Sequence, residues 1–270
     1  MWSGANRGDG NTKLYVQGKI MSASRKFFIS TLLIIAVAAG GAVIGSKIVM
    51  QRSAKENLER TLVQKVEKSS PDTIQESYSF EQFDSVYTQG SWNVSIEKGE
   101  SYSVQIDIPR RAKEEVEVKL DSNTLVLELD SWKTALMAGT MKARIVTPEL
   151  KKIKVAGGSK VTFSGFEGEK LELICEGAIQ TVGESNRYGE LTIDADGAVT
   201  IDLKNSSVEH ARVELSGTGK VEMALVSGGS LAGSIEGLGK ITYSGDDIDV
   251  LVDSGKGLSN IQHVDSFEQD

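Results

Sequence analysis

The sequence predicts an all-β protein, a single-stranded β-helix (β-solenoid) with ~20-residue coils, preceded by an N-terminal transmembrane helix and a short helical stalk. Three observations predict this fold class: a glycine that recurs at a constant spacing from Gly157 to Gly257, alternating polar and apolar residues around it, and an uncharged stretch near the N-terminus. The 28 Gly against 3 Pro also favour a sheet, because proline cannot donate a backbone hydrogen bond to a neighbouring strand.

Composition narrows the classes of function. The chain has 270 residues and a net charge of -8, with 39% hydrophobic residues, which is enough for one or two folded domains with a real core. The acidic balance excludes nucleic acid as the main partner, since binding phosphate needs clustered Lys and Arg. Cys175 is the single cysteine, so an intramolecular disulfide and a multi-cysteine metal site are both excluded.

Residues 27–46 carry no charge over 20 positions. At about 1.5 Å per residue such a helix spans roughly 30 Å, the thickness of a bilayer's hydrocarbon core. The sequence therefore predicts a short N-terminal segment at 1–26 and a transmembrane helix, acting as a signal anchor, at 27–50. Either Met1 or Met21 fits as the start codon.

Two alternatives for this segment stay open. An uncleaved signal anchor is favoured, because the apolar run is longer than the hydrophobic region of a usual signal peptide. A cleavable signal peptide would use the small residues around Ala36 and Ala38. The following residues, 51–77, predict a helical stalk or linker, since apolar residues recur every four positions from Leu58 until Pro71.

A 20-residue repeat dominates the C-terminal half. Glycines recur at one spacing, at Gly157, Gly177, Gly197, Gly217, Gly237 and Gly257. This period is too short for repeats built from helix pairs, which need about 33 residues. It suits strands stacked in register, with the glycine at each bend, where a side chain would collide or the backbone φ is positive.

Two positions fixed relative to each glycine are mostly apolar. Four residues after it stand Val161, Thr181, Ile201, Val221, Ile241 and Ile261, and six before it stand Lys151, Leu171, Leu191, Ala211, Leu231 and Leu251. Even offsets are apolar and odd offsets are mostly polar, as in strands with one buried face. Cys175 takes one of these apolar positions, which predicts a buried, inert thiol.

The block 78–149 alternates in the same way but lacks the regular glycine. We expect it to form the first coils and the cap of the same domain. The predicted solenoid head domain therefore covers residues 78–265.

Several motifs resemble the head GIN domain family, also called the putative auto-transporter adhesin domain. They are TPELKKIKVAGGSKV at 147–161 and the G-x-G-K units at 217–220 and 237–240, and the resemblance covers about residues 79–262. It implies a β-helix-like exported domain of bacterial envelopes, and it implies no reaction. The sequence departs from the family pattern at Ala178 and Ala198, where glycine is more common.

Candidate catalytic residues are few. The two histidines, His210 and His263, lie in no metal-binding or nucleophile motif, and no phosphate-binding loop is present. Asp194 and Asp196 share one face of a predicted strand, where solvated side chains are the simpler interpretation. The sequence thus predicts no enzyme, no cofactor, no metal site and no catalytic residue.

Two outward rows are the candidate binding ladder. One position before the glycine stand Glu176, Asp196, Ser216 and Glu236; three after it stand Lys160, Gln180, Thr200, Lys220, Lys240 and Asn260. We expect a membrane-tethered binding or scaffold module that meets an envelope polysaccharide or a surface protein, with its C-terminal domain outside the cytoplasm. The alternatives are a carbohydrate-active enzyme resembling polysaccharide lyases and an envelope sensor.

Overall fold

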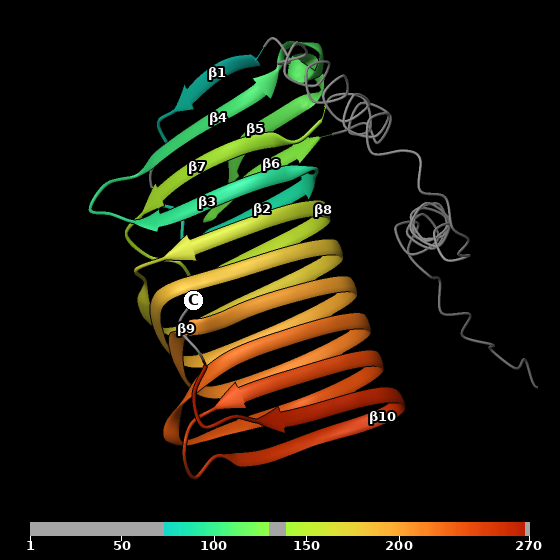
Figure 1. Ribbon diagram of the computed structural model, residues 1–270. Helices are drawn as coiled ribbons and strands as arrows, with labels where there is room; N and C mark the ends of the chain where they lie inside the picture. Colours follow the sequence, from blue (N-terminus) through green and yellow to red (C-terminus); the bar gives the residue numbers. More distant parts are fainter. Residues whose placement is uncertain (1–72, 81, 130–138, 268–270) are drawn as a thin grey trace, which may run out of the picture. The chain divides into compact units, whose positions relative to one another are not determined.

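The computed structural model describes residues 73–80, 82–129 and 139–267, which form one curled β-sheet (Figure 1). Its ten strands and one short 3-10 helix are, in chain order, β1 (Thr73–Tyr78), β2 (Ser85–Gly90), β3 (Trp92–Lys98), β4 (Ser103–Pro109), η1 (Arg110–Glu115), β5 (Val116–Asp121), β6 (Thr124–Leu129), β7 (Met141–Thr147), β8 (Lys152–Ser164), β9 (Glu167–Ser244) and β10 (Asp249–His263). β9 is one continuous strand that bends repeatedly around the core.

The N-terminal part of the sheet is largely antiparallel. β4 lies between β1 and β7 and pairs antiparallel with both, while β5 and β6 form an antiparallel hairpin. In that hairpin Asp121 pairs with Thr124, and Ser122 between them has a positive φ of 54°. A two-residue connection of this kind favours antiparallel strands, because it reverses the chain within one turn.

β2 and β3 join this part to the repeats. Each of them pairs in parallel with β8, so Gly90 lies opposite Gly157 and Val94 opposite Val161. On their other edges β2 pairs with β6, and β3 pairs with β7. The strands β2 and β3 therefore act as the template on which the first 20-residue repeat is laid.

The spacing of the glycines reappears as the register of the sheet. β8 pairs in parallel with β9 at an offset of one repeat, which places Ile153 on Leu173 and Gly157 on Gly177. Within β9 the same offset continues. A Cβ atom added to Gly217 would lie 2.5 Å from the carbonyl oxygen of Gly197, and the φ of Gly217 is +107°. Only glycine fits both the dihedral and the close approach.

The core consists of side chains that repeat along the register. Cys175, Ala195, Leu215 and Ile235 are all buried, which confirms the predicted position of the cysteine, and so are Val161, Thr181, Ile201, Val221 and Ile241. Larger side chains fill the N-terminal end, where Trp92, Phe163 and Phe166 are almost fully buried. One contiguous core thus runs through both the antiparallel strands and the repeats.

A buried amide holds one of the bends. Asn186 accepts a hydrogen bond from the backbone N–H of Phe166 at 3.0 Å, and its amide nitrogen donates to the carbonyl of Phe163 at 3.2 Å and to Ser206 Oγ at 3.0 Å. Satisfying a buried amide in this way specifies the conformation, because an unpaired polar group in the core is costly.

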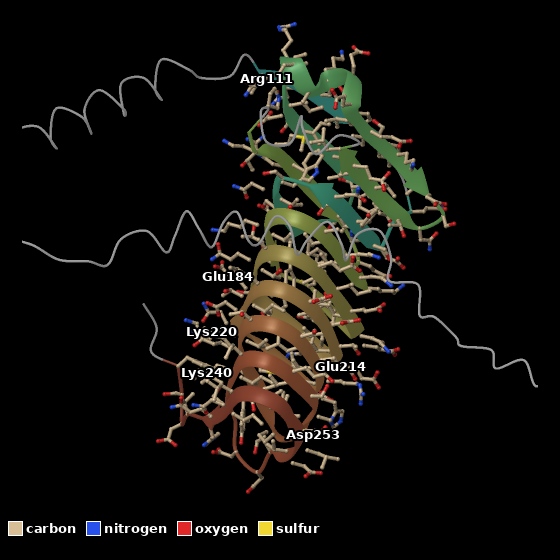
Figure 2. The ribbon with its side chains drawn as sticks, turned by 90° about the vertical axis from the view of Figure 1, so that its right-hand side faces the viewer. Arg111, Glu184, Glu214, Lys220, Lys240 and Asp253 are labelled. Atoms are coloured by element: carbon tan, nitrogen blue, oxygen red, sulfur yellow. The ribbon has the colours of Figure 1, made fainter. Side chains whose placement is uncertain are left out.

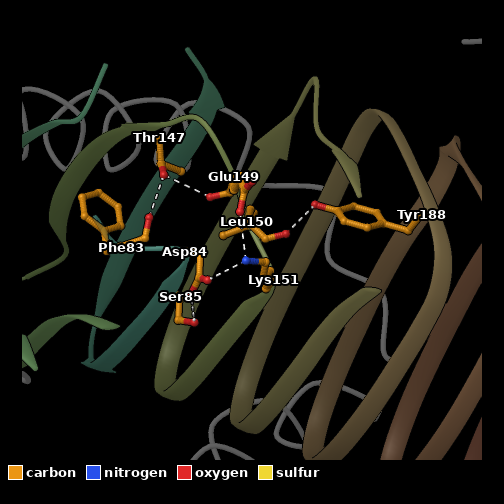
Figure 3. A network of polar contacts seen from close by, with 8 residues as sticks. All are labelled: Phe83, Asp84, Ser85, Thr147, Glu149, Leu150, Lys151 and Tyr188. Carbon is orange, nitrogen blue, oxygen red and sulfur yellow. Dashed lines mark hydrogen bonds and ion pairs between the residues drawn. The ribbon is translucent and has the colours of Figure 1, made fainter. Parts of the chain in front are cut away.

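The TPELKKIKV motif forms a polar junction between β2, β7 and β9 (Figure 3). Thr147 Oγ1 lies 3.0 Å from the carbonyl oxygens of both Phe83 and Glu149, and the buried hydroxyl of Tyr188 donates to the carbonyl of Leu150 at 2.9 Å. Lys151 forms ion pairs with Asp84 at 3.0 Å and with Glu149 at 2.9 Å, and these bonds raise the pKa of Lys151. The motif therefore builds the fold.

The register slips by one position in the last strand. From Gly257 onward each residue of β10 pairs with the residue one full repeat earlier in β9, as Gly257 does with Gly237 and Ile261 with Ile241. Before the irregularity between Ser254 and Gly257, the sequence distance between paired residues is one residue shorter. Consequently Val250 pairs with Leu231, and Leu251 pairs with Ala232. Such a slip turns a side chain to the opposite face, so Leu251 points outward and is 79% exposed.

The expected fold class is wrong beyond its all-β character. A single solenoid over 78–265 is not found, because the described residues form a mixed, curled sheet whose first part pairs antiparallel. The residues 73–149 lack the regular glycine, and short connections such as that of β5 and β6 favour hairpins. No helix among the described residues is long and apolar enough to cross a membrane.

The N-terminal expectations are affected differently. The predicted membrane span at 27–50 and the segment 1–26 lie outside the described residues. The predicted helical stalk at 51–77 is wrong at its end, since β1 already begins at Thr73. The other domain boundaries stay predictions.

Two alanine substitutions test the role of the repeated glycine. We expect Gly217→Ala to lower the free energy of unfolding by about 1–3 kcal/mol, because it forces a strained dihedral and a clash with Gly197. Gly158→Ala is the matched control, since an added Cβ there meets nothing within 4 Å. Equal midpoints for both variants in urea unfolding followed by circular dichroism would contradict the account of the bend.

Candidate binding surface

The candidate rows lie on two different outward faces, separated by the glycine bends. Residues before each glycine form one face and residues after it form the other, since the chain turns at the glycine. Figure 2 shows Lys220 and Lys240 on one side of the sheet and Glu214 and Asp253 on the opposite side. Neighbouring members of a row are one strand spacing apart, about 4.8 Å. The register thus places members of each row on neighbouring strands, and their role in binding stays a prediction.

The acidic row is interrupted and partly neutralised. Ser216 separates Asp196 from Glu236, and Glu176 forms an ion pair with Lys154 at 3.6 Å. The Nζ of Lys154 also lies 5.6 Å from the centre of the Tyr87 ring on β2. The acidic row therefore carries less unbalanced negative charge than its sequence pattern predicts.

Further carboxylates widen the row into a patch, which we call the acidic face: Glu172, Glu176, Asp194, Asp196, Glu214 and Glu236. Asp194 is its centre. Burial raises the pKa of Asp194, and the carboxylates of Glu214, Glu176, Asp196 and Glu172 raise it further. Several carboxylates therefore lie close enough to Asp194 to disfavour its charge.

Cations lie along the margins of the acidic face. Lys152 pairs with Glu172 at 2.9 Å, and Arg212 forms a short ion pair with Glu214. Because these pairs are largely exposed, each contributes little to stability. Near the C-terminal end the face is hollowed between Arg212, Ser234, Leu251 and Asp253.

The lysine row lies on the second face, which we call the lysine face. Lys160, on β8, is exposed beside a shallow hollow whose floor contains Gly158, Ala178 and Ala198 and whose walls include Asn93 and Gln180. Lys220 forms an ion pair with Glu222 at 2.8 Å, and Lys240 pairs in register with Asn260. The small residues that depart from the family pattern, Ala178 and Ala198, therefore line a surface depression.

Glu172 and Glu214 belong to the acidic face although the predicted row does not include them, and Asp194 differs from the ordinary solvated side chain that its position predicts. The signal that could have found them is the alternation itself. Positions one, three and five residues before each glycine from Gly157 to Gly237 point outward, so carboxylates at any of them share one face. Considering only one offset reduced a two-dimensional patch to a row.

The described residues offer little for catalysis. They hold no group of three or more His, Cys, Asp or Glu placed to bind a metal ion. His210 Nδ1 lies 3.0 Å from Ser230 Oγ, but both residues lie on the surface away from the two hollows. Burial raises the pKa of Cys175 to about 11, so its thiol stays protonated and inert at neutral pH.

The fold is similar to that of a putative adhesin from Bacteroides fragilis, with a TM-score of 0.59 and 19% identity over 72% of this chain and 98% of that chain. Weaker likenesses are a putative adhesin from Parabacteroides merdae (TM-score 0.45, 14% identity, 72% and 97% covered) and a putative lipid binding protein from Parabacteroides distasonis (0.44, 14%, 72% and 98%). No curated protein matches the sequence.

The model of one protein family matches residues 82–247, a range that begins just before β2 and ends just before β10. The match includes the polar junction, the glycine bends from Gly157 to Gly237 and most of both charged faces. Since it spans more than half of the chain, it confirms the resemblance that the motifs predict. The protein belongs to the family of the putative auto-transporter adhesin, head GIN domain.

Proposed function

We propose that the protein is a non-catalytic, adhesin-like module that binds an extended ligand along its charged faces. The observation that supports this proposal is the pair of outward faces with different charge, each built from residues that repeat every 20 positions. The family membership supports the adhesin-like role. An envelope polysaccharide or an extended segment of a surface protein has the matching chemistry.

The shape of the faces favours a long ligand over a small one. The hollow beside Lys160 and the hollow beside Arg212 are shallow and polar at their margins, unlike the enclosed apolar pockets that hold small molecules. A polymer that runs across several repeats meets a similar set of groups at each one. Many weak contacts of this kind add up through avidity.

We further propose that this module lies outside the cytoplasm. The exported character that the family name describes and the uncharged residues 27–46 support this location. The anchoring of the chain stays a prediction, because residues 1–72 lie outside the described part.

Protease added to spheroplasts, in which the outer envelope layers are removed and the cytoplasmic membrane is intact, tests the location. We expect fragments of the described domain to appear without lysis, while a cytoplasmic marker protein stays intact. Protection of the domain until the cells are lysed would contradict an extracytoplasmic location.

Two polymers of fixed charge test the binding faces. We expect Glu176→Ala, Asp196→Ala and Glu236→Ala together to weaken binding of the full chain to dextran carrying quaternary ammonium groups by roughly tenfold, which equals about 1.4 kcal/mol. Lys160→Ala, Lys220→Ala and Lys240→Ala together should weaken binding to dextran sulfate by a similar factor. Retention on the immobilised polymers measures both effects.

The control for the acidic triple variant removes three exposed carboxylates elsewhere, with Glu169→Ala, Glu190→Ala and Glu209→Ala. Its net charge changes by the same amount. Equal losses in the control and the test variant would show that total charge, and not the acidic face, determines retention. Unlabelled neutral dextran should bind neither variant.

Binding to the quaternary ammonium polymer should also depend on pH. Because the pKa of Asp194 is raised, this carboxyl takes up a proton at a higher pH than an ordinary Asp, whose pKa is about 3.9. As pH is lowered, retention should therefore begin to fall at a higher pH than it would if Asp194 titrated as an ordinary Asp, while the polymer keeps its charge. Asp194→Asn should remove this early part of the decrease, and a profile identical to that of the unaltered protein would contradict the assignment.

A further inference from the structure

The last strand leaves one edge of the sheet open. β10 pairs with β9 alone among the described strands, so its other edge carries unpaired backbone N–H and C=O groups along 15 residues. A long edge of this kind is a template for pairing with another strand. The edge strands at the other end, β1 and β5, have only six residues each, and η1 packs against both.

Apolar side chains concentrate at this open edge. Leu258, directly after the bend at Gly257, is 78% exposed, and Leu251 is 79% exposed. Val252 and Ile261 pack against the end of the core but are only partly buried, because no further repeat covers them. The edge therefore has the character of a contact surface.

We propose that β10 pairs antiparallel with β10 of a second copy of the chain, around a two-fold axis that passes through the bend at Gly257. An antiparallel neighbour must turn where β10 turns, and this axis places the two bends on each other. The part of β10 before Gly257 in one copy then lies beside the part after Gly257 in the second copy. The same holds when the two copies are exchanged.

Under this symmetry, a residue at a given number of positions before the bend lies opposite the residue at the same number of positions after the bend in the second copy. Because of the slip, Val252 pairs with Gly233 and so takes the fourth position before the bend, while Ile261 takes the fourth position after it. The two residues meet across the axis and extend the core from one copy into the other. At the third positions, Asp253 meets Asn260, so a carboxylate faces an amide that can donate a hydrogen bond to it.

The axis also lies close to an exposed apolar residue beside the bend. Leu258 lies one position from Gly257, so Leu258 of the second copy is its diagonal neighbour. Diagonal neighbours on an antiparallel pair are about 7–8 Å apart, which is within reach of long side chains. Pairing of the two edges therefore places one leucine on each side of the joined bends.

Symmetry favours a second copy over continued stacking of chains. A two-fold contact uses one surface twice and closes after two chains. Head-to-tail stacking has no matching edge, since η1 and short antiparallel strands occupy the other end (Figure 1). The expected assembly is a dimer with its two sheets joined end to end.

Two cysteine variants test this register in the full chain. Asp253→Cys and Asn260→Cys, both at exposed positions, carry different tags, are co-expressed, and are oxidised with diamide. Opposed residues of antiparallel strands have Cα atoms about 4.5–5.5 Å apart, which is within the range of a disulfide. We expect a disulfide-linked dimer that contains one copy of each tag and disappears on reduction. Cys175 does not compete, because it is buried and its thiol pKa is raised to about 11.

The controls make the outcome decisive. Each variant expressed alone should give at least several-fold less dimer, since Asp253 lies opposite Asn260 and not opposite itself. Lys240→Cys co-expressed with Asp253→Cys should also give little, because Lys240 lies one repeat away from the edge. All three residues lie on the surface, so these substitutions leave the core intact. Equal cross-linking in every combination, no mixed dimer, or a disulfide to a different polypeptide would overturn the proposal.

Discussion

The close approach of backbones at the repeated glycines is the constraint on which the rest of the structure depends. At Gly197, Gly217 and Gly237 the α-carbon lies so near the glycine of the preceding repeat that a Cβ atom would collide with its carbonyl oxygen. The chain can turn there because φ is positive, and neighbouring repeats can turn together because no side chain separates them. The bend fixes the register, and the register decides which residues share a face. The two charged faces are therefore a consequence of backbone packing.

Much of the repeat region follows from the sequence for this reason. A 20-residue period with alternating polarity predicts the parallel register of β8 on β9, the burial of Ile201 and Val221, and the burial of Cys175, and each is found. The antiparallel pairing of β1, β4 and β7 does not follow, because alternation reports only which face of a strand is buried. It says nothing about the direction of the neighbouring strand. Strand direction depends on the connections, such as the two-residue link between the antiparallel strands β5 and β6.

The candidate site was predictable in part. Side-chain direction follows from the alternation, so the positions of Glu176, Asp196, Lys220 and Lys240 on outward faces could be foreseen. Their partners could not, because an ion pair such as Lys154–Glu176 joins residues of adjacent repeats whose long side chains have many rotamers. The raised pKa of Asp194 likewise needs the distances among several carboxylates, which no linear pattern contains. Charge counted along the sequence therefore overestimates the charge that a ligand meets.

The register slip at β10 also says which changes of length this fold can accept. Inserting or deleting one whole repeat leaves every inward side chain inward, so it lengthens or shortens the charged faces without altering their pattern. Inserting a single residue inverts the polarity of everything up to the next bend, as the exposed Leu251 illustrates. Such a change is tolerable at the final strand, where no further repeat depends on the register. The addition or loss of one repeat thereby changes the reach of the module along an extended partner by one discrete step.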